Sequence, residues 1–362
     1  MDHLTIGIIG AGYIGREHAR CLRLLKPLFD GRVNVAAIAD QNPEAAQQAA
    51  AMFEIDMATT DTNAVLDHPE INVIFSCLPT KFHLQTVRRA VENGKAVFLE
   101  KPFAVSLEDA QEIHRLLTTS HTPHQVGFVL RYAPVYHALK KKMDEARSHS
   151  PLRTVILRDD QVFPIKGISH FTDWRSRVDL AGAGVLIEHG IHDLDLFEWL
   201  FGSAKRVSAR MGNHAGYPGI EDYMEVRFEF ADGVAANMIH LWHDIPAHQS
   251  IRHFEIFYQQ ALLTLETYDM HHLTVRDEEA EKTYERPDLF RMVAHDPLFK
   301  DLASREDVLF VSDYYAIQDY WFLRNLLGGH SLFPTIGEGL RAFTLAHACY
   351  ESAKQDGAWM PV

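Results

Sequence analysis

Short apolar runs alternate with helical patterns through the first third of the chain. The apolar runs have the length of buried strands and cover residues 4–9, 33–39, 73–77, 95–99 and 124–128. Strands that are apolar on both faces are typical of parallel sheets covered by helices on each side. Helical patterns between them predict helices ending near residue 25 and over 44–53, 62–66, 81–93 and 106–118. This order predicts an α/β domain built on a doubly wound parallel sheet.

The pattern changes at about residue 130, where apolar and polar positions begin to alternate. A basic helix is expected over 135–146. Residues 223–230 alternate cleanly, and Asp232-Gly233 predicts a hairpin turn into the next strand. Strands over 252–258 and 262–266 extend the pattern. We therefore expect an α+β domain with a large, mostly antiparallel sheet that has helices on one face and is open on the other.

These patterns divide the chain into two expected domains. Residues 1–128 form the first domain and residues 129–362 the second, and a helix over about 336–354 is expected to pack back on the first. The open sheet face suits contact with further copies of the chain, so a homodimer or homotetramer is expected.

The turn after the first strand has the sequence Gly10-Ala11-Gly12-Tyr13-Ile14-Gly15. In a strand–turn–helix setting, glycines at this spacing permit a tight turn, let the backbone approach a pyrophosphate and let the helix pack closely on the strand. The amino end of the helix offers N–H groups to phosphates. We therefore predict a Rossmann dinucleotide site with contacts from Gly10, Gly12, Tyr13, Ile14 and Gly15.

The second strand ends at Asp40, where a carboxylate is placed to accept hydrogen bonds from an adenosine ribose. No arginine follows to pair with a 2′-phosphate, and Glu44 adds a repelling charge. NAD is therefore expected rather than NADP. The alternative is that Asp40 only caps the helix that begins near Pro43.

The strand over 73–77 delivers further residues to the same edge of the sheet. Leu78 and Pro79 follow the strand, Thr80 is expected to cap the next helix, and His83 lies in the first turn of that helix. In an open α/β sheet, ligands bind beyond the carboxyl ends of the strands. Leu78, Pro79 and His83 are therefore cofactor candidates. A simple place on the helix surface is the alternative for His83.

The strand over 95–99 ends at Glu100-Lys101-Pro102. Pro102 stops regular strand pairing and biases Lys101 toward an extended backbone. A lysine held at this edge is suited to accept or donate a proton. Glu100 and Lys101 are thus cofactor candidates, and Lys101 is a candidate acid or base. A solvated charge pair at a strand end is the alternative.

Residues 182–200 have the pattern of an amphipathic helix that carries candidate chemistry in the second domain. At 3.6 residues per turn, Glu188 and His192 share one stripe, so the carboxylate is placed to hydrogen-bond and orient the imidazole. This arrangement favours a general acid or base, with an ordinary i, i+4 pair as the alternative. Arg131, Trp174 and Arg175 precede the helix and suit a polyhydroxylated or carboxylated ligand.

Composition narrows the classes of function. The formal charge of −14 argues against nucleic acid or a membrane surface as a partner, since both need a basic footprint. We expect no signal peptide and no membrane-spanning segment. The three cysteines lie far apart within apolar patterns, which fits a reducing compartment and predicts a cytoplasmic location.

The 22 histidines raise the question of a metal site. On a strand, His240 and His243 point to opposite faces and do not share an ion without a bulge. No cysteine–histidine spacing matches a structural zinc site. The pair His271-His272 is expected to be hydrogen-bonded or on the surface, so we predict no metal.

These motifs together resemble the glucose–fructose oxidoreductase/inositol dehydrogenase family, often called Gfo/Idh/MocA. The resemblance rests on Gly10-x-Gly12-x-x-Gly15, on Pro79 with His83, on Glu100-Lys101-Pro102, on the stretch from Trp174-Arg175 through Gly190-x-His192-Asp193, and on the segment over 334–353. It departs from the family at Glu188, where an aspartate is common, and at Thr80, where an asparagine is frequent.

The resemblance implies an NAD-dependent oxidoreductase that acts on a secondary alcohol of a sugar, polyol or inositol-like compound. Lys101 and His192 would handle the hydroxyl proton, with Glu188 as the third catalytic residue. The implied substrate contacts are Lys101, Arg131, Trp174, Arg175, Glu188 and His192. Two alternatives stay open: an NAD-dependent glycosidase or lyase that uses transient oxidation, and a non-catalytic NAD- or sugar-sensing regulator. The regulator is disfavoured because Lys101 and His192 have no evident task in it.

Overall fold

The protein is seen in a computed structural model that describes residues 1–165, 172–245, 247–248, 250–267, 272–302, 304–305 and 313–362. Contacts divide the chain into two compact units. Unit 1 comprises Met1–Tyr132 and Asp301–Leu340, and unit 2 comprises Ala133–Lys300 and Arg341–Val362. Residues 301–340 therefore group with unit 1, whereas the sequence pattern assigned every residue after 128 to the second domain.

Unit 1 contains a six-stranded parallel sheet with the order β3-β2-β1-β4-β5-β6. The strands are β1 (Leu4–Ile9), β2 (Val33–Ala39), β3 (Met57–Thr59), β4 (Val73–Ser76), β5 (Ala96–Leu99) and β6 (His124–Val126). The central strands β4 and β5 are buried at every position, as expected for a sheet covered on both faces. The predicted doubly wound Rossmann sheet is confirmed.

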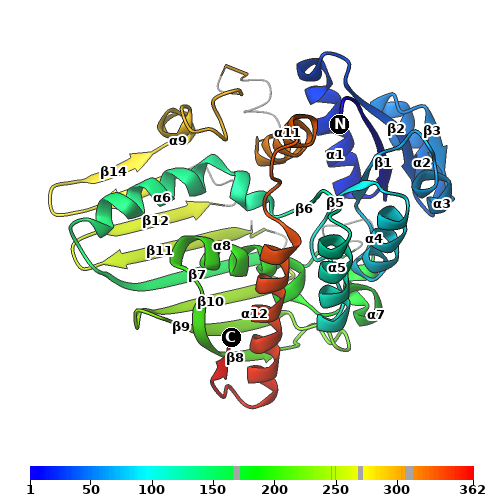
Figure 1. Ribbon diagram of the computed structural model, residues 1–362. Helices are drawn as coiled ribbons and strands as arrows, with labels where there is room; N and C mark the ends of the chain where they lie inside the picture. Colours follow the sequence, from blue (N-terminus) through cyan, green and yellow to red (C-terminus); the bar gives the residue numbers. More distant parts are fainter. Residues whose placement is uncertain (166–171, 246, 249, 268–271, 303, 306–312) are drawn as a thin grey trace. The chain divides into compact units, whose positions relative to one another are not determined.

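Helices cover both faces of this sheet (Figure 1). The helices are α1 (Tyr13–Leu25), α2 (Pro43–Phe53), α3 (Thr62–Leu66), α4 (His83–Glu92), α5 (Leu107–Thr119) and α11 (Asp313–Gly328), with short 3-10 turns η1 (Lys26–Phe29), η2 (Thr80–Phe82) and η3 (Val129–Tyr132). Helix α1 packs against α2 and α11, while α4 packs against α3 and α5 on the other face. Helix α11 comes from residues far along the chain, and its Phe322 packs edge-on against the stacked rings of Phe75 and Phe98.

Two helices have recognisable caps, whereas the cap predicted at Thr80 is wrong. The Ser106 side chain accepts a hydrogen bond from the N–H of Asp109 at the start of α5, and Gly94 has the positive φ of a residue that ends a helix. Thr80 does not cap α4, because the turn η2 intervenes and α4 begins only at His83.

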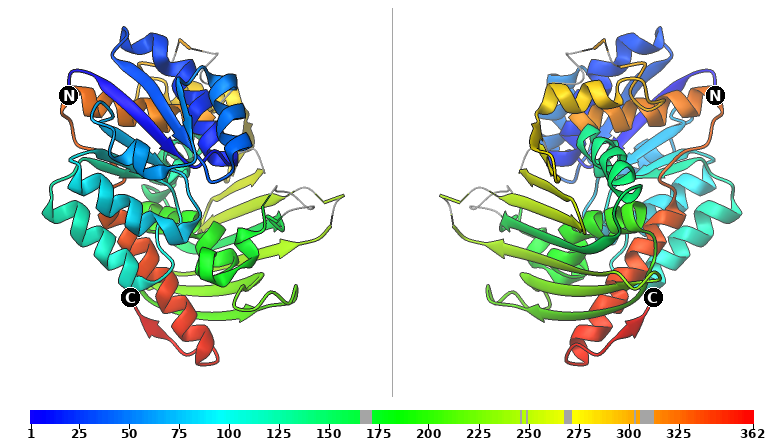
Figure 2. Two further views of the ribbon diagram at one scale, coloured as in Figure 1. Left: turned by 90° about the vertical axis from the view of Figure 1, so that its right-hand side faces the viewer. Right: turned by 90° about the vertical axis from the view of Figure 1, so that its left-hand side faces the viewer.

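Unit 2 contains a nine-stranded sheet with the order β14-β13-β12-β11-β7-β10-β9-β8-β15. Figure 2 shows strands of this sheet in green and yellow. The strands are β7 (Leu152–Val162), β8 (Ala204–Gly212), β9 (Tyr223–Phe230), β10 (Ala235–His243), β11 (Ile251–Tyr258), β12 (Leu262–Thr267), β13 (Leu273–Arg276), β14 (Glu281–Tyr284) and β15 (Met360–Pro361). Only the β7–β10 pair runs parallel among the pairs of described strands, so the predicted mostly antiparallel sheet is confirmed.

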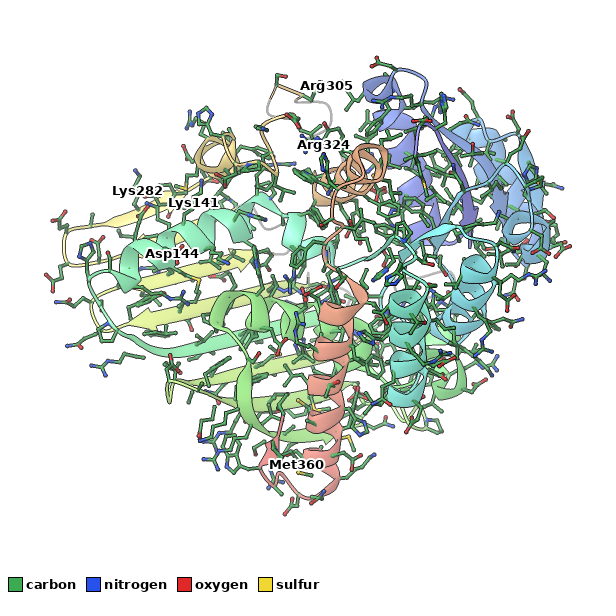
Figure 3. All side chains as sticks on the ribbon, viewed as in Figure 1. Lys141, Asp144, Lys282, Arg305, Arg324 and Met360 are labelled. Atoms are coloured by element: carbon green, nitrogen blue, oxygen red, sulfur yellow. The ribbon has the colours of Figure 1, made fainter. Side chains whose placement is uncertain are left out.

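The helices of unit 2 are α6 (Pro134–Arg147), α7 (Val178–Ala181), α8 (Ile191–Phe201), α9 (Arg286–Val293) and most of α12 (Ile336–Lys354), with a 3-10 turn η4 (Trp174–Ser176) and a π-helical segment η5 (Leu186–Gly190). Phe197 of α8 packs on Phe228 and Phe254 of the sheet. Lys141 of α6 (Figure 3) donates to the carbonyl of Met292 and pairs with Asp296, at 2.7 Å in each case. No helix among the described residues is long and apolar enough to span a membrane.

Candidate active site

The carboxyl ends of β1, β2, β4 and β5 meet at one edge of the parallel sheet. The N–H of Gly10 donates to the carbonyl of Ala39, that of Cys77 to Ile9, and that of Glu100 to Ser76. This edge therefore brings together the residues predicted to contact the cofactor in unit 1: Gly10, Gly12, Tyr13, Ile14, Gly15, Asp40, Leu78, Pro79, Glu100 and Lys101.

The three glycines of the turn meet different surroundings. A Cβ on Gly10 would lie 2.3 Å from the carbonyl oxygen of Cys77, and one on Gly15 would lie 1.8 Å from that of Gly10. Gly10 also has φ +103°, which disfavours other residues. A Cβ on Gly12 meets nothing within 4 Å. Gly10 and Gly15 thus serve close backbone packing, while Gly12 leaves open space at the amino end of α1.

Asp40 supports the glycine turn from the neighbouring strand. Its Oδ2 accepts the N–H of Ala11 at 2.7 Å and its Oδ1 accepts the N–H of Asn42 at 2.9 Å. Asn42, not Asp40, caps α2, since the Asn42 side chain accepts from Glu44 and Ala45. The helix-cap alternative for Asp40 is therefore wrong.

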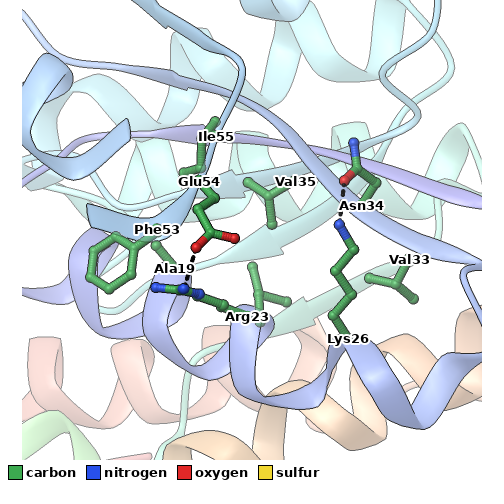
Figure 4. Close-up of a pocket in the computed structure, with 10 residues that line it drawn as sticks. Ala19, Arg23, Lys26, Val33, Asn34, Val35, Phe53, Glu54 and Ile55 are labelled. Carbon is green, nitrogen blue, oxygen red and sulfur yellow. Dashed lines mark hydrogen bonds and ion pairs between the residues drawn. The ribbon is translucent and has the colours of Figure 1, made fainter. Parts of the chain in front are cut away.

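These features fit a dinucleotide. The amino end of α1 has no side-chain cap, so its N–H groups are available to a pyrophosphate beside the open space at Gly12. A separate cavity of about 50 Å³ lies between α1 and β2 and contains the Arg23–Glu54 pair (Figure 4). That cavity has room for little more than a water or two, so it is not the dinucleotide site.

His83 is buried, with 1% of its surface exposed, so the alternative of a surface position is wrong. Its Nδ1 lies 2.8 Å from the hydroxyl of Ser76. Burial lowers the pKa of His83 to about 3, although a backbone hydrogen bond at Leu78 acts to raise this pKa. His83 is therefore neutral and ties the start of α4 to the end of β4.

Glu100 belongs to a buried cluster that sequence reasoning missed. The His18 ring of α1 places Nε2 3.1 Å from Oε1 of Glu100 and Nδ1 2.9 Å from Asp319 of α11. Oε2 of Glu100 accepts the backbone N–H of Lys101 at 3.1 Å. Lys101 itself is partly exposed at the sheet edge. The apolar face of α1 could have predicted that His18 is buried. It could not have predicted that Glu100 and Asp319 are the partners of His18.

The segment that carries His192 is not the single regular helix that the sequence predicted. A π-helical turn over Leu186–Gly190 precedes α8, and it breaks the 3.6-residue stripe between Glu188 and His192. Two residues of this turn contact the sheet. The His189 Nε2 lies 2.7 Å from both Asp159 and Gln161, and Gly190 lies against the His240 ring, where a Cβ would come within 2.9 Å.

The start of this segment is held by another buried carboxylate. Glu221 accepts the N–H groups of Gly184 at 2.7 Å and Leu186 at 3.1 Å, and it accepts the hydroxyl of Tyr350 at 2.8 Å. Glu221 was also missed by sequence reasoning, because it lies more than thirty positions from the N–H groups it binds.

Three of the predicted substrate residues in unit 2 lie together. The Nε of Arg175 donates to Oε1 of Glu188 at 2.5 Å, and the Arg175 guanidinium lies 4.3 Å from the centre of the Trp174 ring. Spacing paired Glu188 with His192, and the structure shows Arg175 as a partner of Glu188 that spacing did not predict. Arg131 is buried in η3 of unit 1, over the Phe333 ring at 4.8 Å, and so does not belong to the second domain as predicted.

Asp193, which follows His192 in the chain, belongs to a second buried charged cluster. Arg252 of β11 donates to Asp159 of β7 at 2.6 Å and to Asp193 of α8 at 3.1 Å. Burial raises the pKa of Asp193 despite the nearby guanidinium. Burial would also raise the pKa of Asp159, but Arg252 and His189 outweigh it and lower that pKa. Burial lowers the pKa of His240 to about 3, so this ring is neutral.

Two Asp–His groups among the described residues are close enough to share a cation. Asp159, Asp193 and His240 form one, but the Arg252 guanidinium already contacts both carboxylates. Asp160, His243 and His248 form the other, where Nδ1 of His243 accepts the N–H of Ile245 and Arg158 pairs with Asp160. His240 and His243 thus fall in separate groups, as their opposite faces predicted. His271 lies outside the described residues.

The chain matches two family models. Residues 4–128 match the model described as an oxidoreductase family with an NAD-binding Rossmann fold, and residues 151–263 match the GFO/IDH/MocA C-terminal domain. Together these matches cover more than half of the chain.

Named relatives agree with this match. A levoglucosan dehydrogenase of Pseudarthrobacter phenanthrenivorans is 28% identical over 58% of this chain and 54% of its own length, so the chain spans about half of that relative. A scyllo-inositol 2-dehydrogenase (NAD(+)) of Bacillus subtilis is 27% identical over 66% of this chain and 67% of its own length. Among solved structures, a levoglucosan dehydrogenase in complex with NADH and levoglucosan has a TM-score of 0.85 at 21% identity, covering 99% of each chain, which shows a shared fold. With both of its family models matched, this chain belongs to the GFO/IDH/MocA oxidoreductase family.

Proposed function

We propose that the protein is an NAD-dependent dehydrogenase acting on a secondary alcohol of a sugar, polyol or inositol-like compound. Membership of an NAD-binding oxidoreductase family supports the redox chemistry. Relatives named inositol and levoglucosan dehydrogenases support the substrate class. The observation that carries the proposal is the position of Lys101. It lies at the same sheet edge as the glycine turn, with its backbone N–H bound to a buried carboxylate.

The proton of the substrate hydroxyl has to leave as the C–H bond is broken. NAD, when bound, supplies the acceptor for the hydride. We assign the hydroxyl proton to Lys101 and His192, as the family resemblance implies. General acid–base help of this kind contributes roughly 10²–10⁴-fold. We assign Trp174 and the Arg175–Glu188 pair to the substrate, since an aromatic face and charged hydrogen-bonding groups suit a polyhydroxylated ring.

Replacing Lys101 tests the assignment most directly. Lys101→Ala should lower kcat by about 10²-fold or more, because the hydroxyl proton loses its acceptor. NAD binding, measured by calorimetry, should persist. Lys26→Ala is the matched control, since Lys26 lies at the far end of α1 and pairs with Asn34. A Lys101 variant that loses turnover and NAD binding to the same extent would indicate a structural lysine.

The reaction class is tested with a panel of sugars and polyols followed at the absorbance of reduced nicotinamide. A dehydrogenase accumulates NADH in proportion to the alcohol oxidised. An enzyme that uses transient oxidation to cleave a glycosidic bond releases product without net NADH, and that result would refute the proposal.

Asp40 is proposed to set the preference for NAD over NADP. Asp40→Ala should raise the ratio of kcat/KM with NADP to that with NAD, because a charge that repels a 2′-phosphate is removed. Asp40→Asn is a second variant that isolates the effect of the charge, since it keeps an acceptor for the N–H of Ala11 but loses the charge. An unchanged ratio in both variants would contradict the ribose assignment.

We also propose a homodimer or homotetramer formed through the open face of the unit 2 sheet. Ile156 of β7 supports this, since it is 37% exposed on a strand whose neighbouring positions Val155 and Leu157 are fully buried on the other face. Ile156→Lys should lower the mass measured by light scattering, and an unchanged mass would count against this surface.

A further inference from the structure

The contacts of His18 suggest a role for this residue that the acid–base assignment does not use. Its side chain is fully buried and surrounded by Phe75, Phe98 and Tyr315, with ring centroids 5.2, 4.9 and 6.0 Å away. In this buried setting both ring nitrogens face carboxylates, Nε2 facing Glu100 and Nδ1 facing Asp319. A ring that donates from both nitrogens is an imidazolium.

The charges around the ring support this protonation state. Burial alone would lower the pKa of His18, but Asp319 and Glu100 raise it to about 10. The pKa of Asp319 is itself raised by burial, which His18 opposes. Glu17 of α1 also contributes a negative charge near Asp319. One cation therefore lies between two carboxylates from elements far apart in the sequence.

Glu100 connects this cation to Lys101. One carboxylate oxygen faces His18 and the other accepts the N–H of Lys101. The carboxylate has little room to move, because a Cβ on Gly127 would lie only 2.4 Å from its Oε1. Immediately after Lys101 the chain is buried again at Pro102 and Phe103. Lys101 thus lies between Glu100, which is held by His18, and the buried residue Pro102.

We propose that His18 is a positioning residue for Lys101, acting through the carboxylate of Glu100. The inference rests on the proposed function, in which Lys101 takes part in moving the substrate proton. Without the imidazolium, Glu100 would be a buried carboxylate lacking its main partner. It would then turn toward another partner and release the backbone N–H of Lys101. A displacement of this kind costs catalysis without removing any group that touches the substrate.

The test compares three variants of the full-length protein. His18→Phe removes both donors, His18→Gln keeps one amide donor, and His124→Gln is a control in the same unit at the amino end of β6. For His18→Phe we expect kcat to fall by about 10²-fold, with the KM for NAD unchanged and with faster hydrogen exchange of the Lys101 amide. His18→Gln should recover part of both losses, and His124→Gln should match the wild type.

Two further measurements decide the inference if a His18 variant does not fold or if no alcohol is oxidised. Asp319→Asn keeps the shape of the cluster and removes one charge, so it should show a smaller loss in the same direction. In the wild type, nitrogen NMR should show both ring nitrogens of His18 protonated at pH 8. A neutral His18 at pH 8, or folded His18 variants with wild-type kcat and wild-type exchange of the Lys101 amide, would overturn the inference. Failure of the wild type to oxidise any alcohol would refute the proposed function alone, since the NMR and exchange results stand without activity.

Discussion

Each unit buries a cluster of one cation and two carboxylates beside a candidate catalytic residue, but the two clusters use different cations. In unit 1 the cation is His18, and the cluster ends at the backbone of Lys101. In unit 2 the cation is Arg252, and Asp193 of the cluster directly follows His192 in the chain. A guanidinium keeps its charge at every working pH, whereas an imidazolium depends on its surroundings to stay charged.

The clusters also differ in how completely their polar atoms are paired. Both ring nitrogens of His18 have carboxylate partners. In unit 2, by contrast, several buried atoms have no hydrogen-bond partner among the described residues: Asp193 Oδ1, Arg252 Nε, and both ring nitrogens of His240. The first cluster therefore depends on the proton of His18. The second depends on the guanidinium of Arg252 and keeps buried polar atoms to which no described residue hydrogen-bonds.

The largest effect is expected from removing the arginine of the second cluster. Arg252→Met should lower the free energy of unfolding by about 3–5 kcal/mol, because Asp159 and Asp193 would be left buried without their cation. Chemical denaturation followed by circular dichroism measures this.

Arg210→Met is the matched control for this change. Arg210 pairs with Asp356 on the surface, where both side chains are more than half exposed. This pair should contribute less than about 1 kcal/mol. If the two arginine variants lose similar free energy, the buried cluster does not stabilise unit 2 as its geometry suggests.

Local patterns in the sequence predicted most of the fold but not these clusters. Strands such as Tyr223–Phe230 and helices such as Tyr13–Leu25 follow from residues next to one another, so periodicity finds them. His18 lies 82 positions from Glu100 and 301 from Asp319, and Arg252 lies 93 from Asp159. No local pattern specifies partners at such separations.

The π-helical turn before His192 was missed for a related physical reason. Its sequence fits an ordinary amphipathic helix, and the turn is accompanied by contacts of His189 and Gly190 with strands β7 and β10. Tertiary contacts of this kind override local periodicity. Spacing also did not reveal Arg175 as a partner of Glu188, because Arg175 lies thirteen positions earlier in the chain.

An intermediate effect is expected from raising the pH, and it should be specific to unit 1. Because the pKa of His18 is raised from 6.5 to about 10, its contribution to stability is complete below pH 6.5 and is lost as the pH rises toward 10. Between those limits the wild type should lose at least about 1.4 kcal/mol more than His18→Gln, the equivalent of one pKa unit. Urea denaturation at pH 6, 8 and 9.5 measures the difference. Parallel profiles for the two proteins would mean that His18 is not charged in the folded state.

The smallest effect is expected at His240, the buried histidine of unit 2 that makes no hydrogen bond to a described residue. His240→Leu keeps a similar volume and removes a ring that is neutral near pH 7, so at that pH the free energy of unfolding should change by less than about 1 kcal/mol. The pKa of His240 is lowered to about 3, so its neutral form supports folding above pH 6.5, and that support is lost as the pH falls toward 3. The variant should therefore lose less stability than the wild type between pH 6.5 and pH 4.5. A loss of unfolding free energy at pH 7 as large as that of Arg252→Met would show that His240 binds a buried water or a charged partner. The unit 2 cluster would then not depend on Arg252 alone, and the contrast with the His18 cluster would fail.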